Sequence, residues 1–392
     1  MAKPTIRFRG FDDEWEQRKF GELGSVAMCK RIFKEQTSPV GDIPFYKIGT
    51  FGAEPDAFIS RELFEEYKEK FQYPKIGDML ISASGTIGRT VEYDGEEAYF
   101  QDSNIVWFKH DERVDNSFLK CIYGIIKWSG IEGSTIKRLY NDNFLKTEFY
   151  MPSVAEQEKV GEYFANLDHI ITLHQRKCDE TKKLKKYMLQ KMFPQNGAKV
   201  PEIRFNGFTH DWEQRKLIDY LEVSSEKNRD NRFTKDDVLS VSGEYGIVNQ
   251  IEFQGRSFAG ASVSNYGVVE NGDVVYTKSP LKSNPYGIIK TNKGIPGIVS
   301  TLYAVYKPKE ITDSKFVQIY FELDSRMNSY MHPLVNKGAK NDMKVSAENA
   351  LKGMVSFPKK DEQEMISLYF SNLDHLITLH QRQHKLHLNA LL

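Results

Sequence analysis

Two blocks of sequence occur twice in the chain, and this internal repeat limits its possible architecture more than any other feature. Ile6–Lys19 (IRFRGFDDEWEQRK) and Ile203–Lys216 (IRFNGFTHDWEQRK) are identical at ten of fourteen positions. Glu156–Arg176 and Glu362–Arg382 are identical at fifteen of twenty-one positions. The chain therefore contains one arrangement twice, in which a variable segment lies between two repeated blocks. We call the repeated blocks the frame.

The two variable segments, Phe20–Pro152 and Leu217–Pro358, share little sequence. One exception is a Gly-Asp step followed by apolar residues, which begins at Gly77 and again at Gly272 and hints at one fold beneath two sequences. If the two copies had diverged at a uniform rate after duplication, all segments would have lost sequence identity equally. We infer that the repeated blocks contact the same kind of partner in both copies, whereas the two variable segments contact two different partners.

The second repeated block predicts one long helix in each copy. Ser153 and Glu156 fit a capping box, and no proline follows before Met192. Apolar or semi-polar residues then recur in alternating steps of four and three, which is the spacing of a coiled-coil seam. The predicted seam residues are Phe164, Leu167, Ile171 and His174 in the first helix and Phe370, Leu373, Ile377 and His380 in the second. Four neighbours are expected to widen the first stripe toward a bundle face, namely Tyr163, Ile170, Leu184 and Leu189.

Each amphipathic helix needs a partner to cover its apolar stripe. Two copies of one unit pack most simply about a pseudo-twofold axis, which makes the two helices antiparallel. The alternative is that each helix folds onto its own domain. The second helix lacks the basic run Lys182–Lys186 and the closing Met192-Phe193 pair of the first, so we expect it to be short at its C-terminal end.

These features predict an α+β fold with a pseudo-twofold internal repeat. Two mixed α/β globular domains, 1–152 and 195–358, are expected to be joined by two long antiparallel coiled-coil helices, 153–194 and 359–392. Local patterning predicts strands at Ile105–Lys109, Asp273–Thr277, Gly287–Lys290 and Leu302–Tyr306, a strand running into a loop within Asp78–Thr90, and helices at Arg61–Phe71 and Phe316–Tyr330.

Composition excludes some classes of protein. Lys plus Arg and Asp plus Glu both number 54, so the formal net charge is zero. A chain of this charge does not bind polyanions through its bulk charge, although a local basic groove is still possible. Three cysteines are too few and too scattered for a disulfide framework. The N-terminus has no apolar signal region and no apolar run is long enough to cross a membrane, so we expect a cytoplasmic protein.

No catalytic motif in the chain is strong. Neither GxxxxGK[ST] nor GxGxxG after a strand occurs. Asn284-Pro285-Tyr286 lacks the second proline of an amino-methyltransferase motif, and Pro55-Asp56 with Glu66-Tyr67-Lys68 matches a nuclease pattern only loosely. His380, His384 and His387 share one helical face, but we interpret them as seam residues because His380 repeats His174. The sequence predicts no catalytic residue and no metal site.

Two unlike globular domains on a rigid helical spacer suit a bipartite ligand such as DNA, whose faces repeat about every 34 Å. Lys and Arg would contact phosphates, and other polar side chains would contact base edges. Basic loops rich in small residues are therefore the candidate DNA-binding segments. The candidate residues are Ser84, Thr86, Arg89, Lys137, Arg138 and Tyr140 in the first domain and Lys278, Lys282, Asn284, Lys337, Lys340 and Lys344 in the second.

With these features together, the whole chain resembles the specificity subunits of type I restriction-modification systems. The resemblance depends on the repeated WEQRK at Trp15–Lys19 and Trp212–Lys216, on the repeated helical block, and on LKKYMLQKMFP at Leu184–Pro194. It implies two target recognition domains that each read one half of a split, asymmetric site in double-stranded DNA. It further implies that the antiparallel helices set the spacer and dock two methyltransferase subunits, which motor-nuclease subunits then join.

The resemblance also implies that this chain has no active site and binds no cofactor of its own. S-adenosylmethionine, ATP and magnesium would belong to the partner subunits. Two alternatives stay open at this point, a nuclease or methyltransferase that acts alone and a coiled-coil adaptor that joins two proteins.

Overall fold

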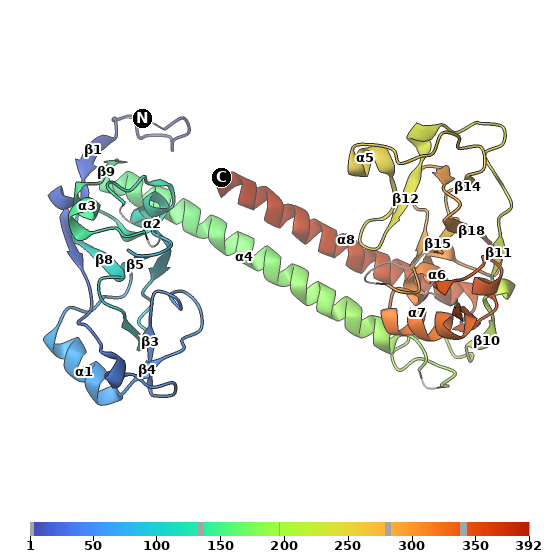
Figure 1. Ribbon diagram of the computed structural model, residues 1–392, viewed down its shortest axis with the longest axis horizontal. Helices are drawn as coiled ribbons and strands as arrows, with labels where there is room; N and C mark the ends of the chain where they lie inside the picture. Colours follow the sequence, from blue (N-terminus) through green and yellow to red (C-terminus); the bar gives the residue numbers. More distant parts are fainter. Residues whose placement is uncertain (1–3, 132–136, 196, 279–283, 338–342, 392) are drawn as a thin grey trace. The chain divides into compact units, whose positions relative to one another are not determined.

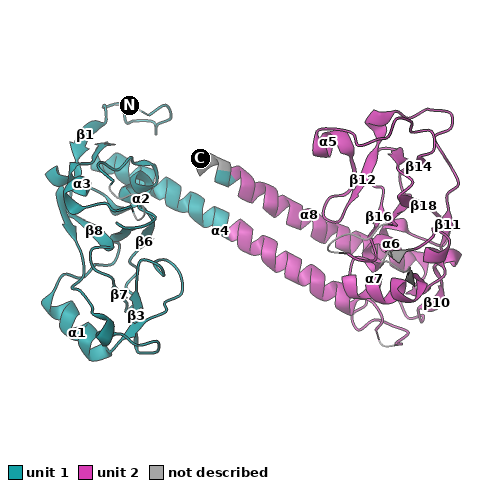
Figure 2. Cartoon of the chain, in the orientation of Figure 1, with its two compact units in different colours: residues 1–172, 387–392 teal, residues 173–386 magenta. Residues whose placement is uncertain are grey.

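The computed structural model describes residues 4–131, 137–195, 197–278, 284–337 and 343–391, with backbone alone at 336–337, 343–344 and 389–391. The chain divides into two compact units, residues 1–172 with 387–392 and residues 173–386 (Figure 2). The division falls inside the first long helix, α4 (Val154–Lys191).

Unit 1 is built around a four-stranded antiparallel sheet in the order β2-β8-β5-β6 (Figure 1). A three-stranded sheet, β4-β3-β7, and a two-stranded sheet, β1-β9, complete it. The elements are β1 (Glu16–Lys19), β2 (Gly24–Ala27), β3 (Ile43–Tyr46), β4 (Phe58–Ile59), α1 (Arg61–Lys70), β5 (Met79–Ser82), β6 (Thr90–Glu92), β7 (Tyr99–Phe100), β8 (Ile105–His110), α2 (Asn116–Ile125), α3 (Asn141–Lys146) and β9 (Glu148–Met151).

Unit 2 contains a sheet of the same order, β11-β18-β15-β16, and a two-stranded sheet, β10-β21, equivalent to β1-β9. The two sequences therefore do form one basic fold, as the shared Gly-Asp step suggests. The elements are β10 (Glu213–Lys216), β11 (Leu221–Val223), β12 (Leu239–Ser242), β13 (Gly246–Asn249), α5 (Gln250–Gln254), β14 (Gly267–Val269), β15 (Val274–Thr277), β16 (Ile289–Thr291), β17 (Gly297–Val299), β18 (Tyr303–Pro308), α6 (Ser314–Tyr320), α7 (Asp324–Met331), β19 (Asn336–Lys337), β20 (Met343–Lys344), β21 (Met354–Phe357) and α8 (Lys360–Leu391).

The predicted helix Phe316–Tyr330 is wrong in one respect, because the segment forms two helices, α6 and α7. The break falls at Phe321-Glu322-Leu323. There the Glu322 carboxylate accepts a 2.6 Å hydrogen bond from the Lys185 ammonium of α4. The backbone of Leu323, the N-cap of α7, is extended, with φ −82° and ψ 113°, so α6 does not continue into α7.

Strand pairs and ion pairs made by the repeated blocks hold each long helix against its domain. Strand β1 pairs with β9, which directly precedes α4, and β10 pairs with β21, which directly precedes α8. Arg7 binds Glu156 through two 2.6 Å hydrogen bonds, and Arg204 binds Glu362 through bonds of 2.7 and 2.8 Å. Both oxygens of Glu156, the residue predicted to complete a capping box with Ser153, thus bind Arg7.

The glutamine that follows this glutamate in each helix also connects the helix to its domain. The Gln157 amide oxygen accepts from the Asp115 backbone N–H at 2.9 Å, and the Gln363 oxygen accepts from Asp313 at 3.0 Å. Asp115 and Asp313 cap α2 and α6, so each buried glutamine ties the start of a long helix to the start of a domain helix.

Within unit 2, α4 and α8 run antiparallel. The Lys185 ammonium lies 2.6 Å from the Asp374 carboxylate, and His174 Nδ1 lies 3.2 Å from His380 Nδ1. As the residue numbers increase along α4, those of the partner residues on α8 decrease, as antiparallel helices require. Among the predicted seam residues, Leu167, Phe370 and Leu373 are buried, and Phe164, Ile171, His174, Ile377 and His380 are partly buried.

The expected widening of the seam on α4 is wrong at three of its four positions. Tyr163, Ile170 and Leu184 are exposed, whereas Leu189 is buried against the core of unit 2. The apolar stripe that α4 buries is therefore narrow, as in a two-helix pair rather than a bundle.

Candidate nucleic-acid interface

An equivalent turn precedes the central strand of each sheet. Asp78 accepts from the backbone N–H of Lys75 at 2.7 Å, and Asp273 accepts from that of Glu270 at 2.8 Å. Gly77 and Gly272, one residue earlier, both have a φ of 89°, a conformation that favours glycine. The Gly-Asp step thus fixes where β5 and β15 begin.

Each central strand ends at an equivalent hydroxyl. Ser82 Oγ accepts from the Arg89 backbone N–H at 2.9 Å, and Thr277 Oγ1 accepts from that of Ile288 at 2.8 Å. The loops that these hydroxyls close differ, because residues 83–88 number six and residues 278–287 number ten. The two units therefore carry loops of different length at the same position of equivalent sheets.

In unit 1, the structure brings the two predicted loops together. Ser84 and Arg138 form an isolated antiparallel bridge, and the Gly85 N–H donates to the Lys137 carbonyl at 2.9 Å. Thr86, Lys137 and Arg138 are exposed. Neither Lys137 nor Arg138 has an ion-pair partner within the described part of the chain, so both cations are available to an anionic ligand.

The other predicted residues of unit 1 have different surroundings. Ser84 is buried, so its contribution is the backbone bridge. The Arg89 guanidinium donates to the Phe51 carbonyl at 2.8 Å and holds the loop after β3. Tyr140 is 49% exposed at the N-terminus of α3, two residues after the bridge residue Arg138.

In unit 2, less of the predicted site is described. Lys278 follows β15 and is partly buried, and burial, with the nearby Lys227 ammonium, lowers the pKa of its side chain. The Asn284 amide donates to the Asp324 carboxylate at 2.9 Å. Lys337 and Lys344 lie on the β19–β20 hairpin, and Lys282 and Lys340 lie outside the described residues.

Lys227 is a cation near Lys278 that the sequence reasoning missed. It is exposed and forms an isolated bridge to Gly267. No sequence motif marks it, because its approach to Lys278 depends on the pairing of segments that lie far apart in the chain. Its position adds a second positive charge at the end of β15.

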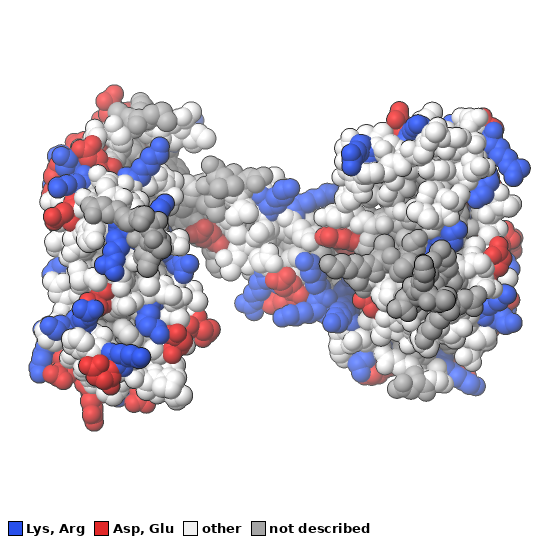
Figure 3. All heavy atoms as spheres, in the orientation of Figure 1, with Lys and Arg blue, Asp and Glu red and all other residues white. Residues whose placement is uncertain are grey.

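The weaker chemical motifs find no support in the described residues. Glu66 and Lys68 lie on α1, and Glu66 pairs with Lys70 at 3.0 Å. No group of three His, Cys, Asp or Glu side chains with metal-binding geometry occurs among the residues that the structure covers. No helix in the described ranges is both long and apolar enough to span a membrane. On the face shown in Figure 3, Lys and Arg are interspersed with Asp and Glu over unit 1.

Parts of the chain are similar in sequence to known proteins. Residues 12–183 match the family described as the type I restriction modification DNA specificity domain. A putative type I restriction enzyme specificity subunit from Haemophilus influenzae is 61% identical over 143 residues. The first part of the chain is therefore similar to type I restriction-modification specificity proteins. The match to the Haemophilus relative covers 36% of this chain and 37% of the relative's length.

The fold of the chain also matches a solved structure. The type I restriction-modification S subunit from M. genitalium has a TM-score of 0.57 over 98% of this chain and 95% of that one. The two are 12% identical, so this likeness concerns the fold alone. It confirms the predicted fold class of two mixed domains with two long helices.

Proposed function

We propose that this chain is the DNA-recognition subunit of a type I restriction-modification enzyme and that its two domains read the two halves of a bipartite, asymmetric site. The observation that supports this most directly is the pair of unlike loops closed by Ser82 and Thr277 on equivalent strands. A constant frame with interchangeable loops is the arrangement that two independent readers require.

In this proposal the paired helices serve as the spacer between half-sites and as the docking surface for methyltransferase and motor-nuclease subunits. The chain itself carries out no catalytic step. S-adenosylmethionine, ATP and magnesium would be bound by those partners, which act on DNA that this chain has selected.

Replacing residues 20–152 with the corresponding domain of another family member should change one half of the target only. The replaced segment begins after β1 and includes its partner strand β9, so β1 and α4 of this chain are kept. Methylation mapping of DNA from cells that express the exchanged chain with its methyltransferase subunits would test this. A change in both half-sites would contradict independent readers.

Replacing Lys137 and Arg138 with Ala should weaken binding to DNA of any sequence. Each lost phosphate contact should also reduce the slope of log affinity against log salt by about 1. Fluorescence anisotropy over a salt series would measure both effects. Lys70→Ala on α1 is the control for loss of a cation outside the two loops, since Lys70 pairs with Glu66. An unchanged slope in the double variant would exclude these two side chains from the interface.

A further inference from the structure

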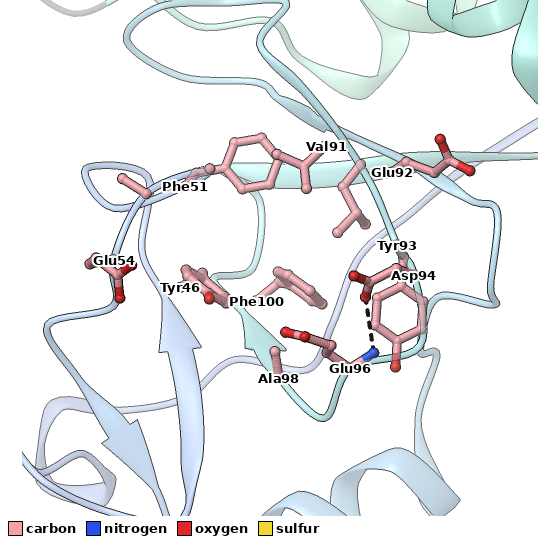
Figure 4. A pocket seen from close by; sticks show the side chains of 13 residues that line it. Tyr46, Phe51, Glu54, Val91, Glu92, Tyr93, Asp94, Glu96, Ala98 and Phe100 are labelled. Atoms are coloured by element: carbon pink, nitrogen blue, oxygen red, sulfur yellow. Dashed lines mark hydrogen bonds between the residues drawn. The ribbon is translucent and has the colours of Figure 1, made fainter. Parts of the chain in front are cut away.

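Unit 1 contains a cavity of about 550 Å³ that the proposed DNA contacts do not use. Its walls come from the end of β3, the loop at residues 51–54, strands β5 and β6, and the segment from Tyr93 to Phe100 (Figure 4). Strand β6 is an edge strand of the four-stranded sheet, so the cavity opens beside the sheet rather than within its core.

The floor of this cavity is aromatic. The rings of Tyr46 and Phe100 are stacked with centroids 5.9 Å apart, and Tyr93 meets Phe100 edge-on at 6.1 Å. Phe100 and Tyr93 are buried, whereas Tyr46 is partly accessible. The Tyr46 ring stacks on Phe100 and is only partly buried, so part of the ring is accessible to a ligand.

The rim of the cavity is acidic. Glu54, Asp94 and Glu96 are exposed, and none of them forms an ion pair in the part of the chain that the structure describes. In Figure 4 the carboxylates of Asp94 and Glu96 point toward the cavity, whereas that of Glu92 points away. Burial, followed by the charges of Glu96, Glu54 and Asp94, raises the pKa of Tyr46, so the negative potential extends to the floor.

We propose that this pocket binds an arginine side chain of a protein partner. A planar guanidinium stacks on an aromatic face and pairs with carboxylates through several donors, which suits this combination of floor and rim. Phosphate groups would be repelled by the same carboxylates, so DNA is not the ligand. The inference concerns a protein contact and does not depend on which DNA sequence is read.

The cavity described in unit 2 has a different lining. A cavity of about 300 Å³ in unit 2 has one carboxylate, Glu252, and one aromatic ring, Phe253, in its lining. The arginine-binding combination is therefore a property of the first variable segment, and exchange of that segment would remove the contact.

Titration of the full chain with a capped Gly-Arg-Gly peptide, followed by saturation-transfer NMR, tests this proposal. We expect saturable binding that is at least about tenfold tighter than binding of the same peptide with citrulline, which keeps the shape but loses the charge. Equal binding of both peptides, or no saturable binding of either, would overturn the proposal.

Variants of the rim test whether binding occurs in this cavity. Glu96→Gln and Glu54→Gln should each weaken the arginine peptide about fivefold, since each removes one carboxylate partner. Glu92→Gln is the matched control and should change binding less than about twofold, because that carboxylate points away from the cavity. An equal effect of all three variants, or displacement of the peptide by a short DNA duplex, would show that the pocket is not an arginine site.

Discussion

Replacing Glu362 with Gln should lower the free energy of unfolding of unit 2 by about 3–5 kcal/mol. Glu362 is 3% exposed and holds the Arg204 guanidinium, whose side chain is 14% exposed. A guanidinium stays charged whatever its partner, so after the substitution Arg204 is left without the carboxylate that binds it. Urea unfolding, with hydrogen exchange of the β10 and β21 amides to localise the loss, measures this effect.

Two companion variants separate the ion pair from a general effect of the substitution. Glu364→Gln, two residues along α8 at an exposed position, should change the free energy of unfolding by less than about 0.5 kcal/mol. The double variant Arg204→Met with Glu362→Leu should recover much of the loss, because no buried charge stays unpaired. A double variant as unstable as Glu362→Gln would show that the region fails for another reason.

This ion pair also shows what the sequence could and could not predict. The long helices and their antiparallel pairing follow from the spacing of apolar residues, which is a local property of the chain. The local sequence, in contrast, predicts a capping box for Glu156 with Ser153, three residues away, whereas the carboxylate binds Arg7, 149 residues away. Identical blocks at both ends of a domain were the signal that could have found this contact, since Arg7 and Glu156 each recur in the second copy.

The candidate interface was predictable to a smaller extent. Composition and loop residues marked the segments around Ser84 and Arg138 separately, but only the tertiary fold joins them through a bridge. Arg89 carries the same charge as Arg138, yet its guanidinium is occupied by the Phe51 carbonyl. Residue type alone does not distinguish a cation that positions a loop from one that is available to a ligand.

The second large effect is expected at Gly161, the glycine that interrupts the helical pattern of α4. A Cβ atom added there would lie 1.7 Å from Ser117 Oγ and 2.5 Å from Ser117 Cβ, so α2 would have to move. Although alanine favours a helix by about 1 kcal/mol over glycine, overpacking of this kind costs about 1–3 kcal/mol or more. We therefore expect Gly161→Ala to destabilise unit 1 and Gly161→Val to do so more strongly.

The same two helices supply the controls. Gly124 lies in α2 with open space around its Cα, so Gly124→Ala should leave stability unchanged or raise it by up to about 1 kcal/mol. Adding Ser117→Gly to Gly161→Ala should cost less than the sum of the single changes, because the clash requires both side chains. The equivalent position on α8 is Ser367, a buried residue of unit 2, so the frame tolerates a side chain there when the facing helix differs. If Gly161→Ala and Gly124→Ala had the same effect, close contact between α2 and α4 would not be what fixes the start of this helix against its domain.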